Sequence, residues 1–203
     1  MYIVSVFLQY FKFFLKIYRI YLQACYCPLV YGIIMAVMIK TMKTINKENI
    51  QEILRSYLTN NQPFDFCYTS TSQEDTELLG KEMAPYLNIG DIINLNGELG
   101  SGKTVFMMGI ADFFHIENQV SSPTFTIVNE YDASLPIFHF DVYRIRSVEE
   151  FYEDIGMDYF ERGVCIIEWG NQIEELLPPH TIHIDIKKNK EDIHTRYFYI
   201  RRN

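Results

Sequence analysis

The stretch GELGSGKT, from Gly97 to Thr104, fits the pattern G-x-x-x-x-G-K-[ST] of a phosphate-binding loop, the Walker A motif. The loop follows the short run IINL, residues 92–95, which we expect to form a strand. It leads into residues 104–114, whose apolar spacing predicts a helix. A strand before the loop and a helix after it are the context that the pattern requires. The motif therefore predicts an α/β fold, a small P-loop NTPase-like domain with a helix-covered mixed sheet.

The spacing of the loop follows from the chemistry of phosphate binding. Glycines at 97, 100 and 102 let the backbone turn tightly, so that successive N–H groups converge on phosphate oxygens. The helix that begins near Lys103 directs its positive dipole end to the same point. Lys103 can bring a mobile charge to the β- and γ-phosphates, and the Thr104 hydroxyl can ligate Mg²⁺. The motif therefore predicts a site for a nucleotide with its metal ion.

Two carboxylates stand at the ends of apolar runs further along the chain. Asp141 closes the run IFHFD and Glu168 closes the run CIIE, where we expect core strands to emerge at the edge of the sheet. Mg²⁺ needs oxygen ligands, usually including one or two carboxylates close to the loop. Asp141 and Glu168 are therefore the candidate metal ligands. His139, inside the first run, is interpreted as a packed core histidine.

The segment SSPTFT, residues 121–126, lies between the loop helix and the strand of Asp141. In phosphate-loop switches this position carries a threonine that senses the γ-phosphate and its Mg²⁺. Thr124 and Thr126 both fit that role, and the sequence does not distinguish between them. A Ser-Pro-Thr turn is also ordinary loop chemistry.

The other elements are predicted from periodicity and helix caps. Residues 49–58 have helical spacing, and TNNQPFD, residues 59–65, is predicted to be a linker. Ser72 and Ser147 each stand three residues before an acid, which predicts two further helix starts. We expect strands at FTIVNEY (125–131), PIFHFDVY (136–143), VCIIEW (164–169), TIHIDIK (181–187) and HTRYFYIR (194–201). The last two predict a C-terminal antiparallel hairpin, which completes one α/β domain over residues 66–203.

The turn of that hairpin contains NKED, residues 189–192, which satisfies the guanine-reading pattern N-K-x-D of GTPases. No D-x-x-G follows the strand of Asp141, and the residues after NKED alternate like a strand rather than starting a helix. We therefore interpret NKED as a hairpin turn and do not expect guanine specificity.

Charge and cysteine content limit the classes of function. The net charge is −8, and residues 1–41 carry four basic residues and no acid, so the remainder carries −12. A domain with this net negative charge is not expected to bind nucleic acid on its own, because binding to the phosphate backbone needs clustered Lys and Arg. The four cysteines show no C-x-x-C spacing, which predicts a reduced, cytoplasmic protein without a structural zinc.

Residues 1–41 form an apolar, basic segment unlike the rest of the chain. Residues 20–39 contain no charge and are about long enough to span a bilayer. Three interpretations stay open: a membrane anchor, a buried helix, or translation from a start upstream of the true one, since Met35, Met38 and Met42 are available. Residues 42–65 are predicted as a helix and linker that lead into the domain. An anchor would make the protein membrane-associated.

Taken together, these pieces resemble the TsaE family, also called YjeE, the small P-loop ATPases of bacterial tRNA threonylcarbamoyladenosine biosynthesis. The matching stretches are SQEDTELLGKEMA, GDIINLNGELGSGKTVF, SSPTFTIVNEY, FHFDVYRI, EEFYEDIGMDYF and CIIEWG. They occur in order over about residues 68–188, and their combination is far more specific than any single piece. Asn171 departs from the family pattern, because many relatives place an acid there.

The resemblance implies a site and a set of partners. It implies binding of ATP and Mg²⁺ at Gly97, Glu98, Leu99, Gly100, Ser101, Gly102, Lys103, Thr104 and Val105. The metal ligands would be Thr104, Glu168 and Asp141, with Asp141 in the Walker B role and Thr76 and Trp169 near the nucleotide. Lys103, Thr124, Asp141 and Glu168 would be catalytic. The family acts with TsaD, which transfers the threonylcarbamoyl group to tRNA, and with TsaB, so that tRNA is bound only through partners.

Two other classes of function share the loop. A small-molecule kinase would need an acceptor pocket and usually an Arg-rich lid, and Arg144 and Arg146 are the only basic pair near the predicted site. A non-catalytic nucleotide-binding scaffold would bind the nucleotide tightly without turnover, even with partners present. The role of Arg144 is left open by the sequence.

Overall fold

The computed structural model describes residues 44–45, 50–59, 64–116, 120–155 and 157–202. These residues belong to one compact unit that extends over 43–203. The predicted apolar segment 1–41 and the candidate starts Met35, Met38 and Met42 lie outside the described residues. Within the described ranges, no helix combines the length and the apolar character that a membrane span needs.

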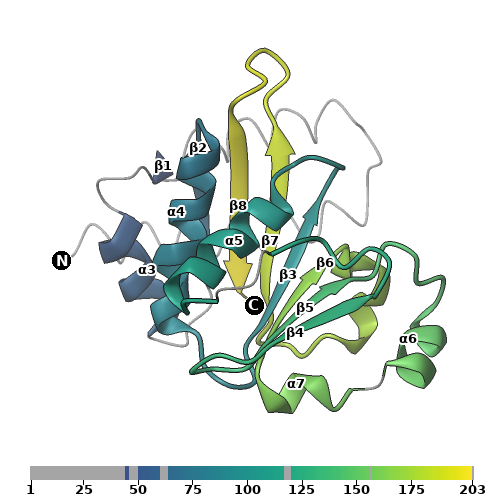
Figure 1. The fold of residues 1–203 in the computed structure, drawn as a ribbon. Coiled ribbons are helices and arrows are strands. Elements are labelled where there is room, and N and C mark those ends of the chain that lie inside the picture. The colour runs from purple at the N-terminus through teal and green to yellow at the C-terminus, as the bar shows by residue number, and fades with distance from the viewer. Residues whose placement is uncertain (1–43, 46–49, 60–63, 117–119, 156, 203) are drawn as a thin grey trace, which may run out of the picture. The chain divides into compact units, whose positions relative to one another are not determined.

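Within the described residues, eight strands form one mixed sheet in the order β1-β2-β8-β7-β3-β6-β5-β4 (Figure 1). Its centre is parallel: β3 pairs with β6 and with β7, and β5 pairs with β6. Antiparallel pairs flank this centre, formed by β4 with β5, β7 with β8, and β8 with β2. The strands are β1 (Thr44–Ile45), β2 (Phe64–Ser70), β3 (Ile92–Gly97), β4 (Val128–Tyr131), β5 (Ile137–Asp141), β6 (Val164–Glu168), β7 (Ile182–Lys188) and β8 (Arg196–Arg202). The predicted mixed sheet and the C-terminal hairpin are confirmed.

Helices cover both faces of the sheet (Figure 1). They are α3 (Ile50–Leu58), α4 (Gln73–Met83), α5 (Lys103–Phe113), α6 (Val148–Asp154) and α7 (Tyr159–Arg162), with 3-10 turns η1 (Ala84–Tyr86) and η2 (Gly170–Leu176). One core joins α3, α4 and α5 to one face, and a second joins α6, α7 and η2 to the other. Alternation along β6 shows the division, since Ile166 packs in the first core and Ile167 in the second.

Both predicted helix caps are present. The Ser72 hydroxyl accepts a hydrogen bond from the Asp75 amide at 3.2 Å, and the Ser147 hydroxyl accepts one from the Glu150 amide at 3.2 Å. The Asp75 carboxylate accepts from the amide and hydroxyl of Thr71, at 2.9 and 2.7 Å. Each cap satisfies a first-turn amide that has no partner within its helix, which explains why α4 and α6 begin where they do.

Two sequence predictions are wrong in part. Phe64 and Asp65, which were expected in a linker, are the first residues of β2, which pairs along its whole length with β8. The strand predicted from 125 begins only at Val128, because the amides of Thr126 and Ile127 donate to the Pro123 carbonyl at 3.1 and 2.7 Å. A local turn therefore replaces the first part of that strand.

Helices α4 and α5 approach each other closely through glycine. A Cβ atom added to Gly109 of α5 would lie 1.9 Å from the backbone oxygen of Glu77 in α4, and one added to Gly80 would lie 2.2 Å from that of Phe106. Real Cβ atoms essentially never come so close to a neighbour. The absence of side chains at both positions is therefore what lets the two helices pack at this spacing.

We predict that Gly109→Ala lowers the free energy of unfolding by about 2 kcal/mol, since overpacking displaces the α4 backbone. Helix propensity alone has the opposite sign, because alanine should stabilise a helix interior by about 1 kcal/mol relative to glycine. Urea unfolding followed by circular dichroism measures the difference. The control is Asp112→Ala in the same helix, which removes only the exposed ion pair with Lys81 and should cost less than about 1 kcal/mol. A stabilised Gly109→Ala variant would contradict the close-contact argument.

Candidate nucleotide site

The phosphate loop joins the end of β3 to the start of α5 and takes its shape from glycine. Gly100 and Gly102 have φ of +69° and +108°, a region that other residues rarely adopt. Gly102 is the N-cap of α5 and provides no side-chain cap. No side chain at the N-cap position therefore competes for the first-turn amides of α5. Free amides at the start of a helix are the groups that bind an anion.

Lys103 lies folded into this loop. Its Nζ donates to the carbonyl oxygens of Gly97 at 2.9 Å and Glu98 at 3.3 Å, and it lies 4.3 Å from the ring centroid of Trp169. The residue is 5% exposed. Desolvation lowers the pKa of Lys103, and the charges of Glu168 and Asp141 oppose that shift. Lys103 is thus a largely desolvated cation that is held by backbone carbonyls at the base of the loop.

The two predicted carboxylates meet at one edge of the sheet. Asp141 ends β5 and Glu168 ends β6, and these parallel strands pair with Asp141 opposite Glu168. Glu168 is also the register partner of Leu95 in β3, two residues before the loop starts. Both carboxylates are buried. Parallel register therefore brings to the phosphate loop two acids that are 27 residues apart in the chain.

Glu168 binds the first turn of α5 directly. Its Oε1 accepts from the Thr104 hydroxyl at 3.0 Å and lies 3.0 Å from Nε2 of His139. The Nε2–H tautomer of His139 would donate to this oxygen beside the Thr104 hydroxyl. Donation by Thr104 leaves its oxygen lone pairs free for a metal ion, which suits the predicted role.

His139 is buried, as predicted, but its contact with Glu168 was missed by sequence analysis. The available signal was spacing. His139 lies two residues before Asp141 on the same strand, so both side chains lie on one face of the sheet. A buried histidine on the face of a predicted metal site is more than packing, because its Nε2 orients the carboxylate.

Asp141 binds the SSPTFT segment. Its Oδ2 accepts from the Ser122 hydroxyl at 2.7 Å and from the Thr124 hydroxyl at 2.6 Å, while its Oδ1 accepts from the Tyr143 amide at 3.1 Å. The Thr126 hydroxyl instead donates to the Asn129 side chain at 3.0 Å. Of the two candidate threonines, the structure therefore brings Thr124 to the carboxylate pair, together with Ser122, which sequence analysis did not single out.

The other predicted residues surround the loop to different degrees. Thr76 is buried, and a Cβ atom on Gly102 would lie 3.6 Å from its methyl group. Trp169, at φ +63°, contacts Lys103 on one side and lies 5.1 Å from the Tyr143 ring. The side chains of Glu98 and Leu99 are exposed, Leu99 by 86%, so those two residues can serve a ligand mainly through their backbone.

Arg144 lies beside the predicted switch segment rather than over the loop. Its guanidinium carbon is 4.4 Å from the ring centroid of Phe125, a side chain that is 84% exposed. The predicted switch segment thus presents an exposed aromatic ring, with an arginine against it, directly after Thr124.

The donor set fits Mg²⁺. Thr104 and Glu168 offer a hydroxyl and a carboxylate, the hard oxygen ligands that Mg²⁺ prefers. In the part of the chain that the structure describes, no group of three or more His, Cys, Asp or Glu side chains could hold a metal ion. A cation at Thr104 and Glu168 would complete its shell with water and phosphate oxygens, as Mg²⁺ usually does.

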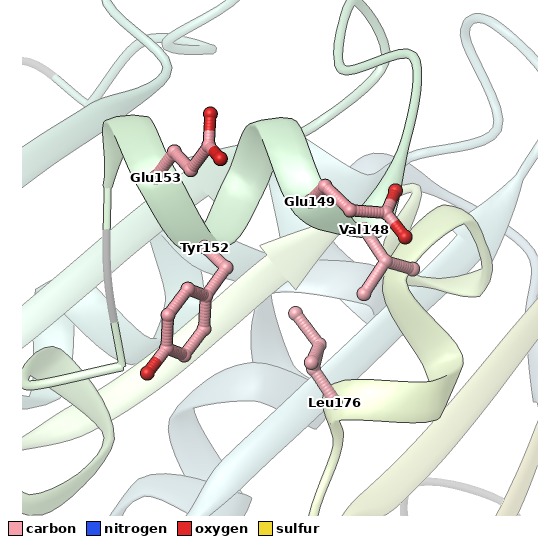
Figure 2. A pocket seen from close by; sticks show the side chains of 5 residues that line it. All are labelled: Val148, Glu149, Tyr152, Glu153 and Leu176. Carbon is pink, nitrogen blue, oxygen red and sulfur yellow. The ribbon is translucent and has the colours of Figure 1, made fainter.

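A shallow hollow of about 210 Å³ lies elsewhere, between α6 and η2 (Figure 2). Its lining residues are Val148, Glu149, Tyr152, Glu153 and Leu176. Figure 2 shows Leu176 of η2 beneath α6, between Tyr152 and Val148 in this view. It shares no residue with the predicted nucleotide site.

The sheet, the loop and its flanking carboxylates define a P-loop α/β protein. A sequence model described as "Threonylcarbamoyl adenosine biosynthesis protein TsaE" matches residues 70–198, and the chain therefore belongs to the TsaE family. The resemblance inferred from the motifs is confirmed.

Named relatives agree with this assignment. The "tRNA threonylcarbamoyladenosine biosynthesis protein TsaE" of Bacillus subtilis is 43% identical over 128 residues, which cover 62% of this chain and 79% of the relative. The protein of the same name from Treponema pallidum is 38% identical over 120 residues, 58% of this chain and 88% of the relative. The crystal structure of Bacillus subtilis YdiB superposes with a TM-score of 0.57 at 33% identity, covering 70% of this chain and 87% of that one.

We predict that Thr124→Val releases the SSPTFT segment, because Asp141 loses one of two hydroxyl donors while the side chain keeps its shape. Hydrogen–deuterium exchange over residues 121–126 should become faster by roughly threefold to tenfold, the factor for losing one hydrogen bond of about 1 kcal/mol. Thr126→Val is the matched control and should leave exchange at the Asp141 end of the segment unchanged. Equal acceleration in both variants would contradict a specific role of Thr124.

Proposed function

We propose that this chain binds ATP with Mg²⁺ at the loop from Gly97 to Thr104 and hydrolyses it as a component of tRNA threonylcarbamoyladenosine biosynthesis. The observation that carries the proposal is the hydrogen bond from Thr104 to Glu168 beside the loop-bound Lys103. It joins a phosphate-loop hydroxyl to a strand-end carboxylate, the pair from which a P-loop protein builds its metal site. The names of the relatives supply the pathway.

Each of the residues at the loop has a part in this proposal. Lys103 would exchange its carbonyl partners for phosphate oxygens, a favourable trade for a cation that is already desolvated. Thr104 and Glu168 would hold Mg²⁺, with His139 keeping Glu168 in place. Bound Mg²⁺ neutralises charge that develops on the phosphates.

Asp141 is proposed to couple the site to the segment 121–126. Its Oδ2 already carries two hydroxyl donors, Ser122 and Thr124, so movement of the segment changes the environment of the carboxylate. P-loop enzymes often gain orders of magnitude in rate when a partner orders such a segment. We therefore infer that the chain alone hydrolyses ATP slowly.

The partners proposed are TsaD and TsaB, with tRNA bound through them. The charge of the chain supports this arrangement, because the sequence after residue 41 carries −12 and offers little to a phosphate backbone. The exposed Phe125, with Arg144 against its ring, is the part of the site that a protein surface could reach. ATP turnover would then let the assembly cycle.

Nucleotide binding is tested by calorimetric titration. We predict that Lys103→Ala weakens ATP binding by at least tenfold, because it removes a charge-assisted contact with the phosphates. Thr104→Val should weaken binding when Mg²⁺ is present and have little effect in EDTA, since its hydroxyl serves the metal. Thr104→Ser, which keeps the hydroxyl, is the control. Equal loss for Thr104→Val with and without Mg²⁺ would contradict the metal role.

Coupling to partners is tested by ATP hydrolysis with and without a purified TsaD–TsaB pair. We predict stimulation of the wild-type protein, and loss of at least a hundredfold of the stimulated rate in Glu168→Gln and Asp141→Asn. Modified adenosine formed per complex is measured in parallel and should stop at about one turnover in these variants. If the pair leaves hydrolysis unchanged and modification cycles without this protein, the proposed function fails. Phosphate transfer to a small molecule would then favour the kinase alternative.

A further inference from the structure

The β7–β8 hairpin places a lysine on the phosphate loop. The residues 187–192, KKNKED, run from the end of β7 into the turn, where the Asn189 side chain accepts from the Glu191 amide at 2.8 Å. The NKED stretch therefore forms the predicted turn. The residue directly before it, Lys188, points toward the loop, and its Nζ donates to the Leu99 carbonyl at 2.6 Å.

Strand register explains how Lys188 reaches the loop. β7 pairs in parallel with β3, with Ile186 opposite Gly97, so β7 continues for two residues beyond the point where β3 ends. Lys188 lies on the same face as Ile186, which is in the core with α5, whereas Lys187 lies on the opposite face. A Cβ atom on Gly100 would lie 3.7 Å from the Lys188 Nζ. Lys188 therefore contacts the tip of the loop, although it lies far outside the Walker A motif in the sequence.

Two cations then serve one loop from different sides. Lys103 holds the carbonyls of Gly97 and Glu98 at the base, and Lys188 holds that of Leu99 at the tip. Desolvation lowers the pKa of Lys103, and the charge of Lys188 lowers it further, so the two ammonium groups interact electrostatically. Two ammonium groups beside one loop repel each other. A phosphate bound in the loop would attract both of them and so offset that repulsion.

We propose that Lys188 is a second cationic residue of the nucleotide site, which holds the tip of the phosphate loop and adds positive charge beside the bound phosphates. The inference rests on the proposed function and extends it to a residue outside the Walker A motif. Lys188 is exposed, so it acts as a screened charge and its effect on affinity is modest.

Calorimetric titration of MgATP into wild type and single variants tests this role. Lys188→Ala should weaken binding by about threefold to tenfold at low salt, the factor for roughly 0.7 to 1.4 kcal/mol, and the difference should shrink as salt rises. Lys188→Gln keeps a hydrogen-bond donor for Leu99 without the charge and should lose as much, whereas Lys188→Arg should bind within about twofold of wild type. Lys187→Ala, the same change one residue away on the other face, is the matched control and should bind like wild type.

The outcomes separate this inference from the proposed function. If Lys188→Ala binds MgATP as tightly as wild type, the proposed role of Lys188 is wrong. If only Lys188→Gln does so, the role of its charge is wrong, because a neutral hydrogen-bond donor would then be sufficient. A loss in Lys187→Ala equal to that in Lys188→Ala would also overturn it, since the effect would be one of general charge. Absence of MgATP binding by the wild-type protein would overturn the proposed function, and this inference with it. Thermal unfolding by circular dichroism should be unchanged in every variant, since both lysines are exposed.

Discussion

Parallel pairing of β3 with β6, and of β6 with β5, is the constraint on which the site depends. It places Glu168 opposite Leu95 just before the loop, and Asp141 opposite Glu168. The hydrogen bond from Thr104 to Glu168 then ties the first turn of α5 to the end of β6. A shift of one residue in β5 or β6 would turn its carboxylate to the other face of the sheet, where phenylalanine and isoleucine side chains form the second core.

Local chemistry was predictable from the sequence, and long-range pairing was not. Local sequence patterns predict features that depend on residues close together in the chain. These are the loop motif, the Ser72 and Ser147 caps and the buried strand that ends at Glu168. Strand β2 was missed because its state is decided by β8, more than a hundred residues away. The contact of His139 with Glu168 and that of Ser122 with Asp141 depend in the same way on which strands become neighbours.

The choice between Thr124 and Thr126 shows how a local turn decides a site. Both residues satisfy the spacing expected of a sensor, but the Pro123 carbonyl accepts from the amides of Thr126 and Ile127. That turn delays the start of β4 to Val128, and the hydroxyl of Thr124, which precedes the turn's last residues, donates to Asp141. The strand predicted from 125 would have included Thr126, whereas in the structure Thr126 lies in the turn and its hydroxyl donates to Asn129.

The glycine contact between α4 and α5 has a consequence for motion. Gly80 and Gly109 bring the two helix backbones together, and a Cβ atom added to Gly102, at the start of α5, would lie 3.6 Å from the Thr76 methyl group of α4. The phosphate loop therefore leads into a helix, α5, that packs backbone to backbone against α4. On the opposite side, the segment 121–126 is held to Asp141 by hydroxyl groups and leaves Phe125 open to solvent. Close backbone packing thus restricts the α5 side of the candidate site, whereas two side-chain hydrogen bonds hold the segment 121–126, so we expect any rearrangement on ligand binding to occur in that segment.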